Sequence, residues 1–126
     1  MNARRTTGAL KSIKPSGGQE DNFFEQVYVV ARQIPKGRVT SYGAIARCLG
    51  TAKSARMVGW AMAVCGAVKP RVPAHRVVNS SGLLTGRHHF ATPTLMEELL
   101  AKEGVMVKEN QVVDFKNKFW DPVQDL

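Results

Sequence analysis

The sequence is poor in cysteine and has no long hydrophobic run. Its two cysteines, Cys48 and Cys65, are too few for a disulfide framework or a zinc site and favour a reducing, intracellular compartment. No apolar stretch approaches the roughly 18 residues that a membrane span requires. The basic N-terminal residues are not followed by an apolar segment, which argues against a secretory signal. We therefore expect no membrane association, no metal and no cofactor.

Acidic residues are absent from a long central stretch. Between Gln26 and Met96, 71 residues contain ten lysines and arginines and all three histidines, but no aspartate or glutamate. Because like charges repel, folding stability explains this distribution poorly. The natural counterpart is a polyanion, and nucleic acid is the commonest polyanion in cells. The competing interpretation is a solvated basic face, and the charge pattern alone does not identify DNA.

The 126 residues suit one domain. Ser, Thr, Gly and basic residues dominate the first part, so we divide the chain into a flexible basic tail at 1–20 and one domain at 21–126. Apolar spacing and capping residues predict helices at 22–34, 42–49 and 55–65. The second helix is capped by Thr40 or Ser41 and the third by Ser54. Two short helices joined by a tight turn are typical of a helix-turn-helix.

The remaining chain predicts small β elements and one more helix. Residues 72–78 and 82–85 are expected to be extended around a turn, and valines on both sides of Glu109-Asn110 predict a hairpin or wing. Thr94 and Glu97 form a capping-box pattern for a fourth helix that stops at Gly104. The predicted fold is α/β (α+β), a single winged-helix-like domain with a helix-turn-helix.

The most informative segment is Pro73-Ala74-His75-Arg76-Val77, which follows the predicted helix-turn-helix. It resembles the active site of the O6-alkylguanine-DNA alkyltransferases, which reads Pro-Cys-His-Arg-Val. The resemblance extends from Phe23 to Trp120 and includes the segments 35–37, 39–43, 55–56, 58–59 and 103–104. It implies the DNA-binding domain of these enzymes, with duplex DNA containing O6-alkylguanine as the partner.

Ala74 stands where these enzymes have the nucleophilic cysteine. A methyl side chain cannot form a thiolate, so alkyl transfer at this position is excluded. In this respect the chain resembles the alkyltransferase-like proteins, in which Trp or Ala replaces the cysteine. That resemblance implies a non-enzymatic sensor that binds O6-alkylguanine, rotates it out of the duplex, leaves the alkyl group in place and flags the site for nucleotide excision repair proteins.

The resemblance also implies roles for individual residues. Arg56 would fill the hole left by the flipped base, and Tyr42 would push on the 3′ phosphate. From the residues alone, Arg56 is equally consistent with a phosphate contact or an exposed arginine, and Tyr42 with a core residue. His75 and Glu103 match a proton-relay network that has no thiol to serve here, so a structural hydrogen bond is the better interpretation. The expected DNA-binding residues are Tyr42, Arg56, Arg76, Thr40 and Ser41, and the expected lesion pocket is Ala74, His75, Val77 and Glu103.

The residues leave other functions open. An engineered Cys→Ala form of an alkyltransferase has the same residue at position 74. Alkyl transfer to Cys48 or Cys65 is a second alternative, although a buried, small apolar role is the stronger interpretation of both. A helix-turn-helix regulator is a third, but such proteins usually dimerise. The chain shows no heptad or apolar extension for this, so we expect a monomer. The pocket roles of Arg87, His88, His89 and Phe90 stay open.

Overall fold

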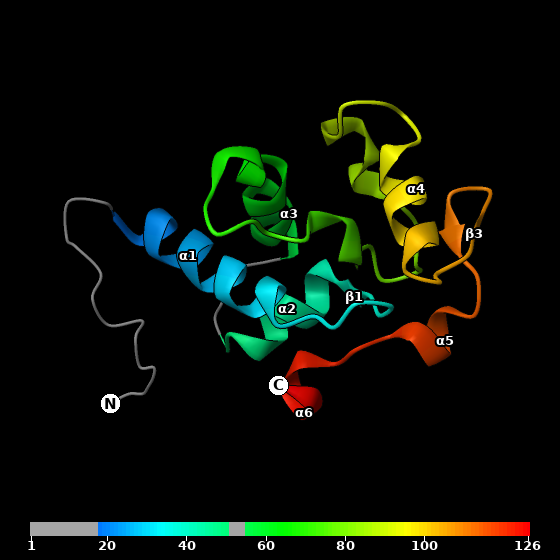
Figure 1. Ribbon diagram of the computed structural model, residues 1–126. Helices are drawn as coiled ribbons and strands as arrows, with labels where there is room; N and C mark the ends of the chain where they lie inside the picture. The colour runs from blue at the N-terminus through cyan, green and yellow to red at the C-terminus, as the bar shows by residue number, and fades with distance from the viewer. Residues whose placement is uncertain (1–17, 51–54) are drawn as a thin grey trace.

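A computed structural model describes residues 18–50 and 55–126 (Figure 1). The helices and strands are α1 (Gly18–Arg32), β1 (Thr40–Ser41), α2 (Tyr42–Cys48), α3 (Ala55–Ala63), β2 (Val77–Val78), α4 (Leu95–Lys102), β3 (Val107–Lys108), β4 (Gln111–Val112), α5 (Phe115–Lys118) and α6 (Pro122–Asp125). Three 3-10 turns lie between them: η3 (Cys65–Ala67), η4 (Ala74–Arg76) and η5 (Thr85–His89). Mixed helices and small strands confirm the predicted α+β class.

The first helix is longer at its N-terminal end than predicted. α1 begins at Gly18 rather than at Asn22 and ends at Arg32. Residues 18–20 therefore belong to the helix and not to the predicted tail. No proline stands between positions 18 and 22, so nothing in the backbone prevents the extra turn. The rest of the predicted tail lies outside the described residues.

Helices α2 and α3 form the helix-turn-helix and pack against each other. Ser41 is the N-cap of α2, and its Oγ accepts a hydrogen bond from the backbone N–H of Ala44 at 3.1 Å. This satisfies one of the free N–H groups at a helix start. The predicted cap of α3, Ser54, lies outside the described residues. Val58 and Met62 of α3 face the core, which leaves its other face open to a ligand.

A parallel strand pair brings the start of α2 to the Pro73–Val77 segment. β1 pairs with β2 so that Thr40 lies opposite Val77 and Ser41 opposite Val78. The expectation of an extended 72–78 segment is wrong for its middle, because η4 occupies Ala74–Arg76. The backbone N–H of Arg76 donates to the carbonyl of Pro73 at 3.0 Å in this turn. The pairing places Tyr42 next to the turn that contains Ala74.

The predicted hairpin is confirmed. β3 and β4 pair antiparallel around Glu109 and Asn110, both of which have positive φ values, 53° and 62°. Positive φ at both central residues is the signature of a type I′ turn, whose twist matches that of the strands. The hairpin also pairs with the Gly82–Leu84 segment, since Leu84 N–H donates to the Asn110 carbonyl at 2.9 Å. The 82–85 segment therefore pairs with the hairpin and not with β2.

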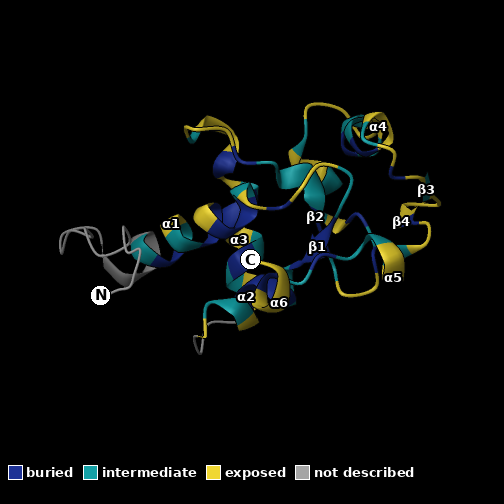
Figure 2. Ribbon diagram, turned by 60° about the horizontal axis from the view of Figure 1, so that its bottom comes forward, coloured by how far each residue is buried: buried dark blue, intermediate teal, exposed yellow. Residues whose placement is uncertain are grey.

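Two apolar clusters form the core. Figure 2 shows where the buried residues lie along the chain. One lies under α1, α2 and α3 and contains Val27, Ile45 and Val58 among its fully buried members. The other lies under α4 and the hairpin and contains Leu84 and Leu100. Adjacent residues of β2 join the two clusters, Val77 in the first and Val78 in the second. The turn that carries Ala74 is therefore fixed at the junction of the two clusters.

Candidate nucleic-acid interface

A pocket of about 570 Å³ lies beside the exposed face of α3. α3 provides one wall, the η5 turn with its flanking residues provides the other, and Tyr42 and Ala74 complete the lining. The lining residues are Tyr42, Ala55, Arg56, Gly59, Trp60, Met62, Ala63, Ala74, Thr85, Gly86, His89 and Phe90. We call this space the base pocket. None of these residues is acidic, and two of them, Arg56 and Tyr42, are the residues to which the resemblance assigns the flipping step.

A smaller chamber of about 250 Å³ adjoins the base pocket. Ala74 lines both spaces, as do Met62, Ala63, His89 and Phe90. The methyl group of Ala74 is the smallest side chain after glycine, so position 74 fills little of the space where the two adjoin. We call the second space the rear chamber.

Arg56 is held against an exposed aromatic side chain. Its guanidinium lies over the Trp60 ring, 5.2 Å from the ring centroid, and Trp60 is 48% exposed. Residues four apart in a helix lie on the same face, and a cation over an indole is a favourable pair. The resemblance assigns no role to Trp60, although this residue stands four positions after Arg56. Its spacing from Arg56 was the available signal.

Tyr42 lies at the start of α2, half-buried, with its ring against the first core cluster. Burial is the main influence on the phenol and raises its pKa. The hydroxyl therefore stays protonated and able to donate to a phosphate oxygen. A methyl group on Gly86 would lie 2.9 Å from this hydroxyl, so the glycine is needed for the close approach of η5 to Tyr42. The sequence interpretations of Tyr42 as a core residue and as a pocket residue are therefore compatible.

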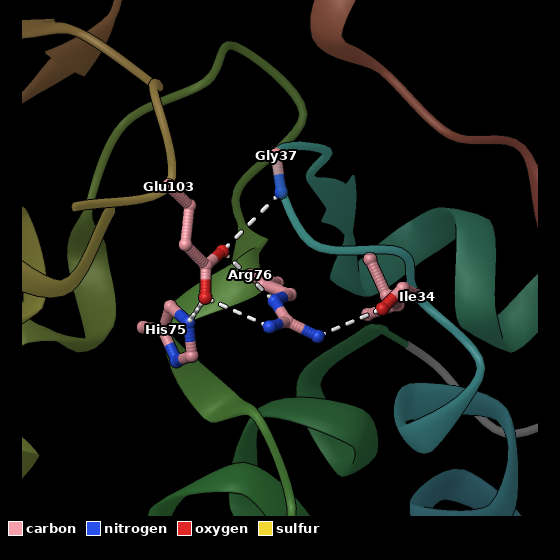
Figure 3. Close-up of polar contacts among 5 residues, drawn as sticks. All are labelled: Ile34, Gly37, His75, Arg76 and Glu103. Atoms are coloured by element: carbon pink, nitrogen blue, oxygen red, sulfur yellow. Dashed lines mark hydrogen bonds and ion pairs between the residues drawn. The ribbon is translucent and has the colours of Figure 1, made fainter. Parts of the chain in front are cut away.

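Glu103 ties three segments of the chain together (Figure 3). Arg76 donates to it twice, from Nε to Oε1 at 3.0 Å and from Nη2 to Oε2 at 2.7 Å. His75 Nε2 lies 2.8 Å from Oε2, and the backbone N–H of Gly37 donates to Oε1 at 3.4 Å. Arg76 Nη1 also donates to the carbonyl of Ile34 at 2.9 Å. The network connects η4, the end of α4 and the loop after α1.

The network sets the protonation of its members. Burial alone would raise the pKa of the Glu103 carboxyl, but the hydrogen bonds from Arg76 and then His75 outweigh it and lower this pKa to about 2. Burial lowers the pKa of the His75 imidazole, and the bond to Glu103 opposes this only in part. His75 is therefore neutral at pH 7. Because the carboxylate can only accept, the proton of His75 is on Nε2. The predicted structural role of both residues agrees with this geometry.

Several predicted site residues do not reach the pocket. Thr40 and Ser41 are buried in β1, so their side chains are not accessible to DNA, and the Ser41 hydroxyl is already used as a helix cap. Val77 is 1% exposed and belongs to the core. Glu103 faces the rear network and does not line the base pocket. The parallel β1–β2 pairing, which no local pattern predicts, turns Thr40, Ser41 and Val77 inward, and the ion pair with Arg76 holds Glu103 away from the base pocket.

The other predicted residues divide between the two spaces. Ala74 lines the base pocket, and His75 lines the rear chamber. Arg76 braces the turn through Glu103 and Ile34 instead of presenting its guanidinium to solvent. Of the four loop residues left open by the sequence, His89 and Phe90 line the base pocket, and Arg87 and His88 do not.

The family follows from comparison with known proteins. Residues 22–105 match the family model of the 6-O-methylguanine DNA methyltransferase, DNA binding domain. The chain belongs to this family. The resemblance predicted from the Pro73–Val77 motif is confirmed, and the match includes the helix-turn-helix, the base pocket and the Glu103 network.

Relatives within the family include proteins named as alkyltransferase-like and as DNA base-flipping proteins. Alkyltransferase-like protein 1 of Schizosaccharomyces pombe is 36% identical over 96 residues, which cover 76% of this chain and 88% of the relative. The DNA base-flipping protein of Escherichia coli is 33% identical over 110 residues, covering 82% and 78%. The crystal structure of S. pombe Atl1 in complex with damaged DNA containing O6-carboxymethylguanine superposes with a TM-score of 0.69 at 33% identity, covering 82% of this chain and 98% of that one. A DNA-damage binding role is therefore supported for this chain.

Two further observations concern the part of the chain that the structure describes. None of its helices is long and apolar enough to cross a membrane. No group of His, Cys, Asp and Glu side chains within residues 18–50 and 55–126 is arranged to hold a metal ion.

Proposed function

We propose that this chain is a non-enzymatic sensor that binds O6-alkylguanine in duplex DNA and rotates the damaged nucleotide into the base pocket. The observation that carries the proposal is the base pocket itself: Arg56, Tyr42 and Ala74 converge on one space that holds no acidic side chain. This space lies on the exposed face of α3, the helix that a helix-turn-helix protein presents to DNA.

The flipping step needs a replacement for the lost stacking. Extruding a base costs a few kcal/mol of pairing and stacking free energy. Arg56 is exposed and planar, so its guanidinium can leave Trp60 and occupy the vacated position opposite the unpaired base. The protonated Tyr42 hydroxyl donates to the phosphate beside the rotated nucleotide. Cations of the acid-free stretch between Gln26 and Met96 supply phosphate attraction.

The bound lesion is not repaired in this proposal. Ala74 offers no nucleophile beside the base, and the neutral His75 and the Glu103 carboxylate have no thiol to activate. Cys65 lines the rear chamber, but burial raises the pKa of its thiol, as it does for Cys48. A protonated thiol is a poor nucleophile. Since the alkyl group stays on the base, removal falls to other proteins, and we propose that nucleotide excision repair proteins recognise the complex, with the sensor bound as a monomer.

The test is a titration of two labelled duplexes that differ only in O6-methylguanine or guanine at one position, at fixed salt because phosphate contacts make the affinity salt-dependent. We expect at least about tenfold tighter binding of the lesion duplex, or about 1.4 kcal/mol. Arg56→Ala is expected to remove most of this preference. Arg47→Ala, an exposed arginine of α2 that does not line the base pocket, is the matched control and should weaken both duplexes equally. Equal affinity of the wild type for both duplexes would contradict the proposal.

A mass measurement separates the sensor from an enzyme. After incubation with excess O6-methylguanine duplex, the intact mass of the protein should not change. A gain of one methyl group on Cys65 or Cys48 would establish alkyl transfer instead. A regulator would show the reverse pattern in the titration, namely a preference for one base sequence with no effect of the lesion.

A further inference from the structure

The lining of the rear chamber carries positive charge. This charge affects which O6-alkylguanine lesions the proposed sensor binds most tightly. Twelve residues line the chamber, and none of them is acidic. Arg71 is the permanent cation among them, because the other basic side chains of the lining, His75 and His89, are imidazoles and not guanidinium or ammonium groups. Within the described residues the ion pair is formed by Arg76 and Glu103, and Arg71 has no carboxylate partner there.

Beyond the rear chamber lies a groove of about 450 Å³ that is also basic. Arg71, His75 and Leu99 line both spaces, so the groove continues from the chamber. Its one acid, Glu103, is already paired with Arg76. Its other cations come from the end of α1 and the loop after it, from η4 and from the end of α4: Arg32, Lys36, Arg76 and Lys102. Arg32 donates twice to the carbonyl of Pro70, the residue directly before the arginine at the chamber wall. Arg71 is therefore surrounded by positive charge.

The base pocket, the rear chamber and the groove adjoin one another in this order, starting from the position proposed for the flipped base. A substituent on O6 of a guanine bound beside Ala74 would point past this small side chain, which lines both spaces, toward the rear chamber. At about 30 Å³ for a water molecule in the liquid, a chamber of about 250 Å³ has room for a substituent of several heavy atoms.

We infer that the rear chamber selects O6 substituents that carry an anionic group, with Arg71 as the residue that recognises the charge. The inference rests on the proposed function and adds a substrate class to it. A carboxylate in the chamber meets the Arg71 guanidinium and the potential of the groove, and no acid of the chamber lining repels it. A neutral substituent of the same size gains neither interaction.

The experiment compares duplexes that carry O6-carboxymethylguanine, O6-carbamoylmethylguanine, O6-methylguanine or guanine at one position. The carboxymethyl and carbamoylmethyl groups have nearly the same shape and differ in charge. We expect about fivefold tighter binding of the carboxymethyl duplex than of the carbamoylmethyl duplex, the upper end of what an exposed ion pair contributes. The ratio should fall as salt is raised.

Variants assign the preference to Arg71. Arg71→Gln should bring the carboxymethyl to carbamoylmethyl ratio to about one, and Arg71→Glu should bring it below one. Lys69→Gln, an exposed basic residue nearby that does not line the chamber, is the control and should keep the wild-type ratio. Any general loss of phosphate attraction affects both duplexes and cancels in the ratio.

The outcomes separate the two proposals. A wild-type ratio of one, with O6-methylguanine still preferred over guanine, would overturn the charge selection and leave the sensor function standing. A ratio that Arg71→Gln does not change would overturn the role of Arg71. If none of the lesions binds better than guanine, the sensor proposal itself fails.

Discussion

Replacing Glu103 by glutamine tests whether the network behind Ala74 is structural. The Glu103 side chain is only 9% exposed, and its carboxyl pKa is lowered from 4.5 to about 2. At about 1.36 kcal/mol per pKa unit, this difference corresponds to about 3 kcal/mol of folding free energy at pH 7. Glutamine keeps the size but loses the charge, and its NH2 group faces the donors of Arg76 and His75. We expect Glu103→Gln to lower the free energy of unfolding at pH 7 by about 3 kcal/mol.

The pH dependence gives the sharper measurement. A carboxyl whose pKa is lowered by folding stabilises the native state above its unfolded pKa, and this contribution is lost as the pH falls toward the folded pKa. The difference between wild type and Glu103→Gln should therefore shrink from about 3 kcal/mol at pH 7 to below about 1 kcal/mol at pH 2.5. Urea unfolding followed by circular dichroism at a series of pH values measures it. Glu98→Gln, at an exposed position of α4, is the control and should change stability by less than about 0.5 kcal/mol. A difference that is constant with pH, or an equal loss in the control, would refute the reasoning.

Two more predictions concern the base pocket. Gly86→Ala places a methyl group 2.9 Å from the Tyr42 hydroxyl, so we expect about tenfold weaker binding of the O6-methylguanine duplex with a change in unfolding free energy below about 1 kcal/mol. Unchanged lesion affinity would show that the Tyr42 hydroxyl does not act there. Arg56 must leave the Trp60 ring to enter the DNA, so tryptophan emission should change when the lesion duplex binds, and the change should be absent in Trp60→Phe. A change that persists in Trp60→Phe would have to come from the buried Trp120 and would contradict the role given to Arg56.

Much of the local structure could be predicted because its signals are local. Ser41 caps α2, and Gly50, with a φ of 58°, follows its end, as a capping serine and a stop glycine predict. The alternation of valines around Glu109-Asn110 predicts the hairpin. These elements depend on hydrogen bonds and dihedral preferences within a few residues, and the residue types at those positions determine both. Thr94 shows the limit: its hydroxyl donates to Glu98 at 2.7 Å and makes no capping bond to the backbone.

The sequence by itself determined the family, the helix-turn-helix and the absence of a thiol at position 74, because each depends on residue identities in a fixed order. The tertiary structure decided which of the motif residues face the ligand. The parallel pairing of β1 with β2 joins residues almost forty positions apart, buries Thr40, Ser41 and Val77, and leaves Ala74 at the pocket. The charge of the rear chamber likewise comes from side chains that only packing brings together. Such contacts depend on how the chain as a whole buries its apolar surface, and not on the local conformational preferences of neighbouring residues.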